Sequence, residues 1–312
     1  MPFRIVPDET TIPFMRFARW GFPASVVAMV ASLVLFFVVG LNLGIDFRGG
    51  TLIEVQSQSG AVDIGAVRQT LQPLELGDFE VQGFGSGNEA VIRIATQPGG
   101  DEAQQAAVQK VQNALGFDDY NYRRVEVVGP RVSGELAETG TIAVLVTLVG
   151  VLFYIWFRFE WQFAIGAIAS LLHDVILTIG FFTITQIEFN LSSIAAILTI
   201  VGYSLNDTVV IFDRVREMLR KFKQTPIRGI IDLSVNQTLS RTLLTSLTTL
   251  IALAALFFFG GAVIRSFTAA MIWGVFIGTY STVFIAAPML IFFNLRPEKV
   301  APPETAKKPA TS

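Results

Sequence analysis

The chain has 312 residues, of which 52% are hydrophobic and 15% are charged, and its mean hydropathy is +0.57. Ordinary soluble domains carry about 25% charged residues, so this composition indicates a membrane protein. The net charge of −2 gives no sign of a nucleic-acid partner. The absence of cysteine excludes disulfides and thiolate metal sites, and a single histidine argues against a histidine metal cage, so we expect no cofactor and no metal.

Six apolar stretches are long enough to span a membrane, for which about 20 residues are needed. They run over residues 24–43, 140–157, 163–184, 190–212, 242–259 and 267–293. The first is not expected to be a cleaved signal peptide, because it starts late, is too long, and precedes no small-residue cleavage site.

A polar stretch of about 95 residues, long enough for a small domain, separates the first two spans. Its apolar periodicity and turn residues predict strand, helix, strand, strand, helix and strand over residues 51–57, 61–76, 79–84, 90–95, 101–115 and 120–128, with a hairpin turn at 85–88. This order fits a ferredoxin-like fold. The predicted fold is therefore a bundle of six transmembrane helices with a small α+β ferredoxin-like periplasmic domain between helices 1 and 2.

Loop charges predict the orientation of the chain in the membrane. The connection at 213–240 is rich in Arg and Lys and should face the cytoplasm, as should both termini. The predicted domains are a cytoplasmic N-terminus (1–23), the first helix (24–43), a periplasmic domain (44–138), a five-helix region (139–295) and a disordered cytoplasmic tail (296–312).

Asp207 lies inside an apolar span, where a charged side chain costs about 2.5–3.5 kcal/mol and is a functional candidate by default. Helical spacing places Ser204, Ser193 and Asn190 near its face, and Asn206 is assigned to the same supporting stripe. Such a stripe should face the bundle interior or a water-filled path.

Arg241 is the expected partner of Asp207, because the two lie at similar depths in neighbouring antiparallel spans. They could form a purely structural ion pair, or Arg241 could extend to the lipid headgroups. A carboxylate balanced by one movable cation could instead bind and release a proton, and the polar stripe favours this interpretation. Asp213, six residues after Asp207, is expected to interact with nearby arginines.

His173 and Asp174 lie near the middle of the third span. Adjacent helical residues project about 100° apart, so we expect only one of them to face a given path. A neutral His173 bonded to a neighbouring helix is the simpler alternative, but both residues are candidates for a proton route.

The spacing of Gly274 and Gly278 permits close helix approach, either within the monomer or between subunits. Enzyme motifs such as HExxH, GxSxG and the P-loop are absent, so we do not expect an enzyme.

Four ordered motifs resemble those of the SecD/SecF family of protein-export membrane proteins. GIDFRGGT at 44–51, containing the turn residues Gly44, Asp46, Arg48, Gly49 and Gly50, is similar to the family signature, although a purely structural Asp46–Arg48 pair is an alternative reading. VGPRVSGEL at 128–136 resembles the entry into the second span. LLHDV at 171–175 and VGYSLNDTVVIFDRVRE at 201–217 look like the SecF branch.

This resemblance implies half of a resistance-nodulation-division architecture, with SecD as the other half. It further implies association with the SecYEG channel, with YajC as a candidate partner, and with translocating preproteins at the bacterial inner membrane. The family picture has the proton gradient drawing preproteins outward, with the residues that match Asp207 and Arg241 supporting proton passage.

Two other functions stay open at this point. A self-sufficient solute or lipid exporter of the same superfamily would need a homodimer and usually a larger outer domain. A structural scaffold of the channel would use its buried charges for assembly alone.

Overall fold

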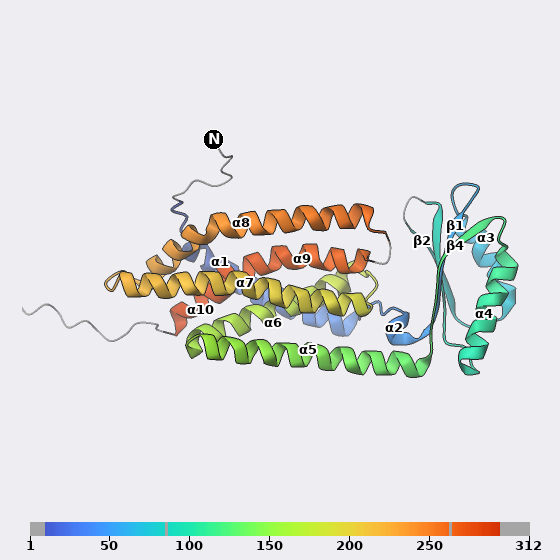
Figure 1. The fold of residues 1–312 in the computed structure, drawn as a ribbon, viewed down its shortest axis with the longest axis horizontal. Coiled ribbons are helices and arrows are strands. Elements are labelled where there is room, and N and C mark those ends of the chain that lie inside the picture. The colour runs from blue at the N-terminus through green and yellow to red at the C-terminus, as the bar shows by residue number, and fades with distance from the viewer. Residues whose placement is uncertain (1–9, 85–86, 262–263, 294–312) are drawn as a thin grey trace, which may run out of the picture.

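The computed structural model describes residues 10–84, 87–261 and 264–293. A bundle of long helices carries a small sheet domain at one end (Figure 1). Among the described residues, six helical spans are long and apolar enough to cross a membrane, as the sequence predicts. They are α1 (Phe14–Val38), α5 (Pro130–Arg158), α6 (Trp161–Thr185), α7 (Leu191–Lys221), α8 (Ile227–Phe259), and a last span formed by α9 (Arg265–Ser281), a π-helical segment (Thr282–Ala286) and α10 (Ala287–Phe292). The predicted tail at 296–312, residues 1–9 and the turn residues 85–86 lie outside the described parts.

The region predicted as a basic loop at 213–240 is mostly helical. Helix α7 continues to Lys221, and α8 begins at Ile227 rather than at residue 242. The helices extend because apolar side chains in this region, including Val215, Met218 and Ile231, are buried in the main core of the bundle. The long hairpin therefore packs as part of the bundle.

Helix α1 begins at Phe14, earlier than the predicted start at residue 24, and α8 holds that beginning in place. The Oδ1 of Asp232 accepts a hydrogen bond from the Met15 amide at 2.8 Å. The Asn236 side chain bonds both the amide and the carbonyl of Ile12, each at 2.9 Å. The Met15 contact satisfies an amide that the first turn of a helix leaves free, and the Asn236 bonds hold the residue just before the helix.

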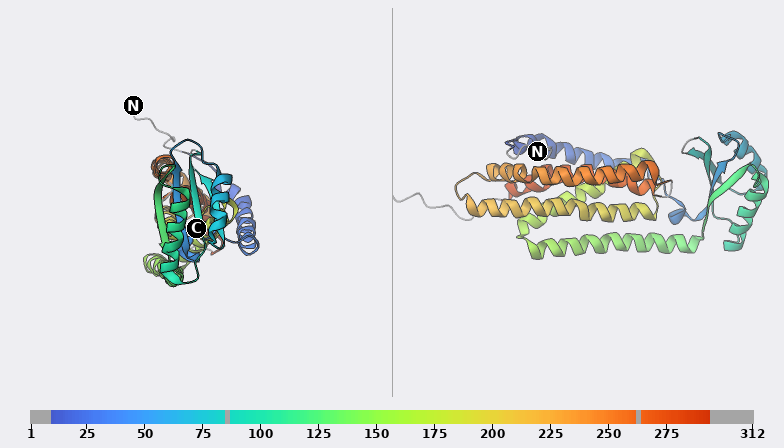
Figure 2. Two further views of the ribbon diagram at one scale, coloured as in Figure 1. Left: turned by 90° about the vertical axis from the view of Figure 1, so that its right-hand side faces the viewer. Right: turned by 45° about the horizontal axis from the view of Figure 1, so that its top comes forward.

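The six spans differ in how deeply they are buried. More than half of the apolar window is buried in α6 and in the last span (56% each), against 11% in α1 and in α5. Helices α6, α7 and α9 therefore form the centre of the bundle, and α1, α5 and α8 surround it; Figure 2 gives the end-on view.

Gly274 and Gly278 bring α9 close to α7. A Cβ added at Gly274 would lie 2.2 Å from Ile200 Cγ1, and one at Gly278 would lie 3.0 Å from Ser204 Cβ. The glycine pair thus packs within the monomer, the first of the two alternatives that its spacing allowed.

The outer domain has the predicted order of elements. It consists of β1 (Gly50–Ser57), α3 (Ile64–Leu71) with a short 3₁₀ turn, β2 (Phe79–Phe84), β3 (Glu89–Ile94), α4 (Gly100–Leu115) and β4 (Tyr120–Val128). The strands pair antiparallel in the order β2-β3-β1-β4, as in a ferredoxin-like fold. Inward-facing residues such as Ile53, Ile92 and Val111 form its own core, which explains the alternation in the sequence.

The sheet stands between its own helices and the membrane bundle. Helices α3 and α4 cover the face away from the bundle, and the other face points toward the ends of the membrane helices (Figures 1 and 2). The short helix α2 (Ile45–Arg48) lies at the junction, directly before β1. The polar outer face of β1 and β3 is therefore positioned to contact the membrane part.

Candidate functional site

The carboxylate of Asp174 is the centre of a buried polar cluster where α6, α7 and α9 meet. Asp174 is 0% exposed. Its Oδ2 accepts hydrogen bonds from Ser204 Oγ on α7 at 2.6 Å and from Ser281 Oγ on α9 at 2.8 Å. Ser170 on α6 donates in turn to Ser281 at 2.9 Å, which makes a short chain of hydroxyl groups ending on the carboxylate.

His173 also contacts this carboxylate, so both predicted residues belong to one site. Its Nδ1 lies 2.9 Å from Asp174 Oδ1, and the histidine is fully buried. The two side chains turn toward each other, and the expectation that only one of them faces a given path stays a prediction. The alternative of a bond to a neighbouring helix is wrong, since the bond runs to the adjacent residue of α6.

The other ring nitrogen of His173, Nε2, is buried without a hydrogen-bond partner among the described residues. The ring stacks on Tyr280, with centroids 6.0 Å apart, and the Tyr280 hydroxyl donates to the Gly21 carbonyl of α1 at 3.0 Å. An unsatisfied buried polar atom costs about 1–3 kcal/mol. Such an atom is free to bind a water molecule or a proton.

Asp207 lies on the same face of α7 as Ser204, one helical turn away, and is 4% exposed. Its Oδ2 is buried and has no hydrogen-bond partner in the described chain. Arg241 lies exposed on α8, and among the described residues no carboxylate forms an ion pair with it within 4.0 Å. The structure therefore does not form the expected ion pair of Asp207 and Arg241.

The predicted polar stripe divides into two groups. Ser204 belongs to the Asp174 cluster, whereas Asn190 and Ser193 form a capping box at the start of α7, in which each side chain bonds the other's backbone amide at 3.1 Å. Asn206 was wrongly assigned to the stripe: it is exposed, because it projects about 100° away from Asp207. Asp213 pairs with Arg158 at 3.0 Å and with Arg216 at 3.9 Å, as its position predicts.

The signature turn at 44–50 joins the outer domain to α7. Asp46 Oδ2 accepts from the Leu191 amide at 2.8 Å, so Asp46 caps α7 and does not pair with Arg48. Gly50 is required sterically, because its φ is +117° and an added Cβ would lie 2.4 Å from the Ile94 carbonyl oxygen. A Cβ on Gly44 would lie 2.5 Å from Glu188 Oε1 and would displace that side chain.

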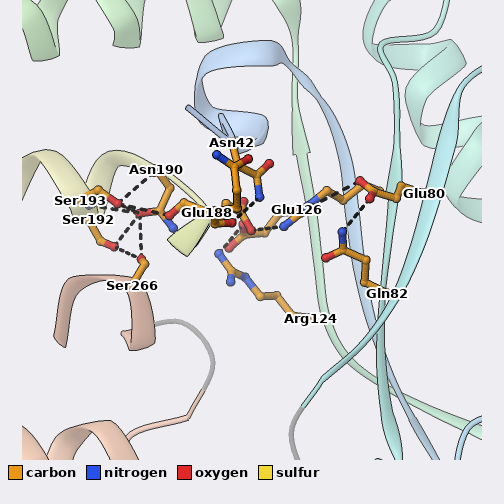
Figure 3. A network of polar contacts seen from close by, with 12 residues as sticks. Asn42, Glu80, Gln82, Arg124, Glu126, Glu188, Asn190, Ser192, Ser193 and Ser266 are labelled. Atoms are coloured by element: carbon orange, nitrogen blue, oxygen red, sulfur yellow. Dashed lines mark hydrogen bonds and ion pairs between the residues drawn. The ribbon is translucent and has the colours of Figure 1, made fainter. Parts of the chain in front are cut away.

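Further polar contacts join the sheet to the loop between α6 and α7. Arg93 of β3 forms an ion pair with Glu188, and both side chains are largely buried. Figure 3 shows Glu188 between the sheet residues Arg124 and Glu126 and the cap residues Asn190, Ser192, Ser193 and Ser266. Arg124, Glu126, Glu188, Asn190 and Ser266 border a cavity of about 420 Å³. The start of α7 is thus bonded both to α9 and to the outer domain.

Sequence reasoning missed Ser281, Ser170 and Tyr280 in the membrane cluster and Arg93 and Glu188 at the junction. A signal for Ser281 exists, because Gly274, Gly278 and Ser281 share one helical face. In the described part of the chain no three acidic, His or Cys side chains gather as a metal site would require.

Two family models match the chain. The model "Protein export membrane protein SecD/SecF, C-terminal" covers residues 107–296, and the "SecD/SecF GG Motif" covers residues 34–61. The chain is 48% identical over 311 residues to protein translocase subunit SecF of Rhodobacter capsulatus, covering 95% of this chain and 93% of that protein. It is 46% identical over 296 residues to protein translocase subunit SecDF of Brucella abortus, covering 95% of this chain but 39% of the longer protein.

Solved structures of SecDF proteins have the same fold as this chain. The crystal structure of SecDF, a translocon-associated membrane protein from Thermus thermophilus, matches with a TM-score of 0.83 at 32% identity, over 94% of this chain and 40% of that one. SecDF in a super-membrane-facing form matches over the same shares at the same identity, with a TM-score of 0.69. The chain is therefore closer in arrangement to the first of these two structures.

Proposed function

The chain belongs to the SecD/SecF family of protein-export membrane proteins, and on this premise we propose that it is a SecF-type accessory subunit of the Sec translocase, which uses the proton gradient to promote preprotein export. The 93% coverage of a SecF relative and the 39% coverage of a SecDF relative support this assignment. SecD is the proposed partner in the membrane, since the fused relatives are named for both subunits.

The observation that carries the proton-coupled part of the proposal is the unsatisfied polar chemistry in the middle of the bundle. Asp207 Oδ2 and His173 Nε2 are buried and unpartnered among the described residues, although each lies in a membrane helix. Ionisable groups at such depth are expensive and characteristic of proton relays. We assign proton binding to Asp207 and to the Asp174–His173 pair.

Ser204 is the proposed link between these groups. Its hydroxyl donates to Asp174 at 2.6 Å, and it precedes Asp207 by one turn on the same face of α7. A hydroxyl can accept one hydrogen bond and donate another. A shift of α7 would therefore change which of the two carboxylates accepts the hydrogen bond from Ser204. Arg241, which is unpaired with Asp207 here, would supply the balancing charge in another arrangement of α7 and α8.

A proton bound in the bundle would affect the outer domain because α7 contacts both the proton-binding groups and the outer domain. Its inner half bears Ser204 and Asp207, and its first turn is bonded to Asp46, next to the Arg93–Glu188 ion pair. Displacement of α7 would thus reach β1 and β3 through polar contacts. The two SecDF structures match this chain with different TM-scores, which indicates that the SecDF fold occurs in more than one arrangement. We propose that this chain also has more than one arrangement.

The proposed orientation places the sheet domain (44–138) in the periplasm and both termini in the cytoplasm. The positive charges at the end of the bundle away from the sheet support it, including Arg214, Arg220 and Lys221. In this orientation the outer domain faces emerging preprotein, and SecYEG and YajC are the further proposed partners.

The test is preprotein export into membrane vesicles depleted of native SecF and supplied with the parent chain, Asp207→Asn or Asp213→Asn, with and without a proton gradient. Asp213→Asn is the matched control, because it removes a carboxylate from the same helix at its exposed end. Asp207→Asn should assemble with SecD and lose the gradient-stimulated part of export, while Asp213→Asn keeps it. Equal export by the parent and Asp207→Asn would leave only a scaffold role for Asp207.

A further inference from the structure

A second site lies at the end of the bundle opposite the sheet domain, between α1, α8 and α10. It is a cavity of about 490 Å³. Its walls are mostly apolar and include Phe22, Pro23, Ile291 and Phe292. Three arginines stand around it: Arg16 and Arg19 from the first turns of α1, and Arg228 from the first turn of α8.

Three arginines stand against one carboxylate in this cavity, so the protein leaves part of the positive charge unbalanced. Asp232 is the one acidic residue among those that line it, and its carboxylate is occupied by the Met15 amide. Within the described parts of the chain, no carboxylate lies within 4 Å of a guanidinium nitrogen of Arg16, Arg19 or Arg228, whereas Arg158 and Arg214 at the same end are paired. All three cavity arginines are exposed.

The position of the cavity corresponds to the headgroup level of a membrane. Trp20 (74% exposed) and Trp161 (53% exposed) stand at this end of the bundle, where aromatic side chains mark the interface. Arg19 lies over the ring of Trp20, with 5.9 Å from its Cζ to the ring centroid. A ligand here would have its polar group beside the arginines and its apolar part along Phe22 and Phe292.

From this geometry we infer that the cavity binds one anionic phospholipid, with the phosphate between Arg16, Arg19 and Arg228 and an acyl chain along the groove between α1 and α10. Basic pockets between membrane helices recognise acidic lipid headgroups in this way. The apolar walls favour a lipid over a free phosphate, which would use the arginines alone. The site is remote from Asp174 and independent of the proposed proton chemistry.

The experiment measures retention of dioleoylphosphatidylglycerol against dioleoylphosphatidylcholine on the full-length chain by native mass spectrometry. The variant Arg19→Gln/Arg228→Gln is compared with Arg220→Gln/Lys221→Gln, which removes two exposed positive charges from the end of α7, outside the cavity. Each cavity arginine should contribute roughly fivefold to the preference for the anionic lipid. The control pair should retain the preference. Equal loss in both pairs, or no loss in the cavity variant, would overturn the proposal.

Two further measurements distinguish the lipid from two other possible occupants of the cavity. Glycerophosphoglycerol, the headgroup without acyl chains, should fail to displace the lipid; effective displacement would mean a soluble phosphate site instead. A chain ending after Phe293 should bind the lipid as the full chain does. If the lipid binds only after this truncation, the cavity is occupied by the chain's own C-terminal segment and the proposal is wrong.

Discussion

Helix α7 carries polar side chains in two regions that differ in how fully they are hydrogen-bonded. At its outer end, Asn190 and Ser193 form a capping box, and Asp46 accepts a hydrogen bond from the Leu191 amide. In its inner half, Asp207 has a buried oxygen without a partner, close to a cluster in which His173 has an unpartnered nitrogen. The satisfied region holds the helix to its neighbours, and the unsatisfied region is where the proposed function places proton binding.

The strongest test of this contrast is Asp174→Ala. It removes the acceptor of Ser204 and Ser281 and the contact of His173, leaving buried donors unpaired. We expect the free energy of unfolding to fall by about 3 kcal/mol, measured by thermal or denaturant unfolding in detergent. Ser170→Ala, which removes one donor to Ser281, should lose only about 1 kcal/mol. Comparable losses in the two variants would show that the carboxylate does not organise the cluster.

Gly274→Ala tests whether helix approach assembles the same cluster. The added methyl would meet Ile200 on α7, and overpacking of this kind costs about 1–3 kcal/mol. Ile200→Ala should lower the unfolding free energy less in the Gly274→Ala chain than in the parent, a rescue expected because it removes the clashing atoms. Absence of any such rescue would mean that the glycine is not required for contact with α7.

Asn190→Ala sharpens the comparison from the satisfied end of α7. Losing a capping side chain typically costs about 1 kcal/mol, so the unfolding midpoint should fall modestly. Because the cap is remote from the unsatisfied atoms, SecD binding and gradient-stimulated export should persist after mild destabilisation. Loss of the gradient response with normal stability and SecD binding would place the cap in the coupling itself and remove the distinction between the regions.

Glu54 of β1 should give the smallest effect, with a defined pH dependence. Burial, reinforced by the nearby Glu89, raises the pKa of Glu54 above its ordinary value of 4.5, against opposing charges from Arg124 and Arg123. The folded state therefore binds this proton more tightly than the unfolded state, and this favourable contribution is lost as pH rises through the folded pKa. Glu54→Gln should raise the melting temperature at pH 8 relative to the parent, with less difference at pH 4.

The exposed Glu102 on α4 provides the matched control for that measurement. Glu102→Gln should leave the difference between pH 4 and pH 8 unchanged. If both variants shift the pH dependence alike, the effect belongs to net charge and not to the buried position of Glu54.

The fold was predictable where local patterns determine it. Alternating residues such as Ile53 and Val55 predict strands, and long apolar runs predict the spans, because burial forces these periods on a sequence. The start of α8 could not be predicted from local patterns. Its polar first turns are helical only because Ile231 and Val235 pack into the core. Tertiary packing there overrides the polar character of the segment.

Only part of the candidate site could be predicted from the sequence. The energetic penalty of burying charge identifies Asp207 and Asp174 from the sequence alone. Their partners depend on which helices meet: Ser281 lies 107 residues from Asp174, and only the approach of α9 brings it there. The expected pairing with Arg241 failed because similar depth in two helices does not fix the directions of their side chains.

The hydrogen bond from the Met15 amide to Asp232 also constrains the order in which the protein can be completed during its synthesis. The two residues are 217 positions apart, and ribosomes add about 5–20 residues per second. The first helix must therefore remain in the membrane for roughly 10–45 s before the residue that caps it has been made. Until then the Met15 amide lacks the acceptor that it has in the finished bundle.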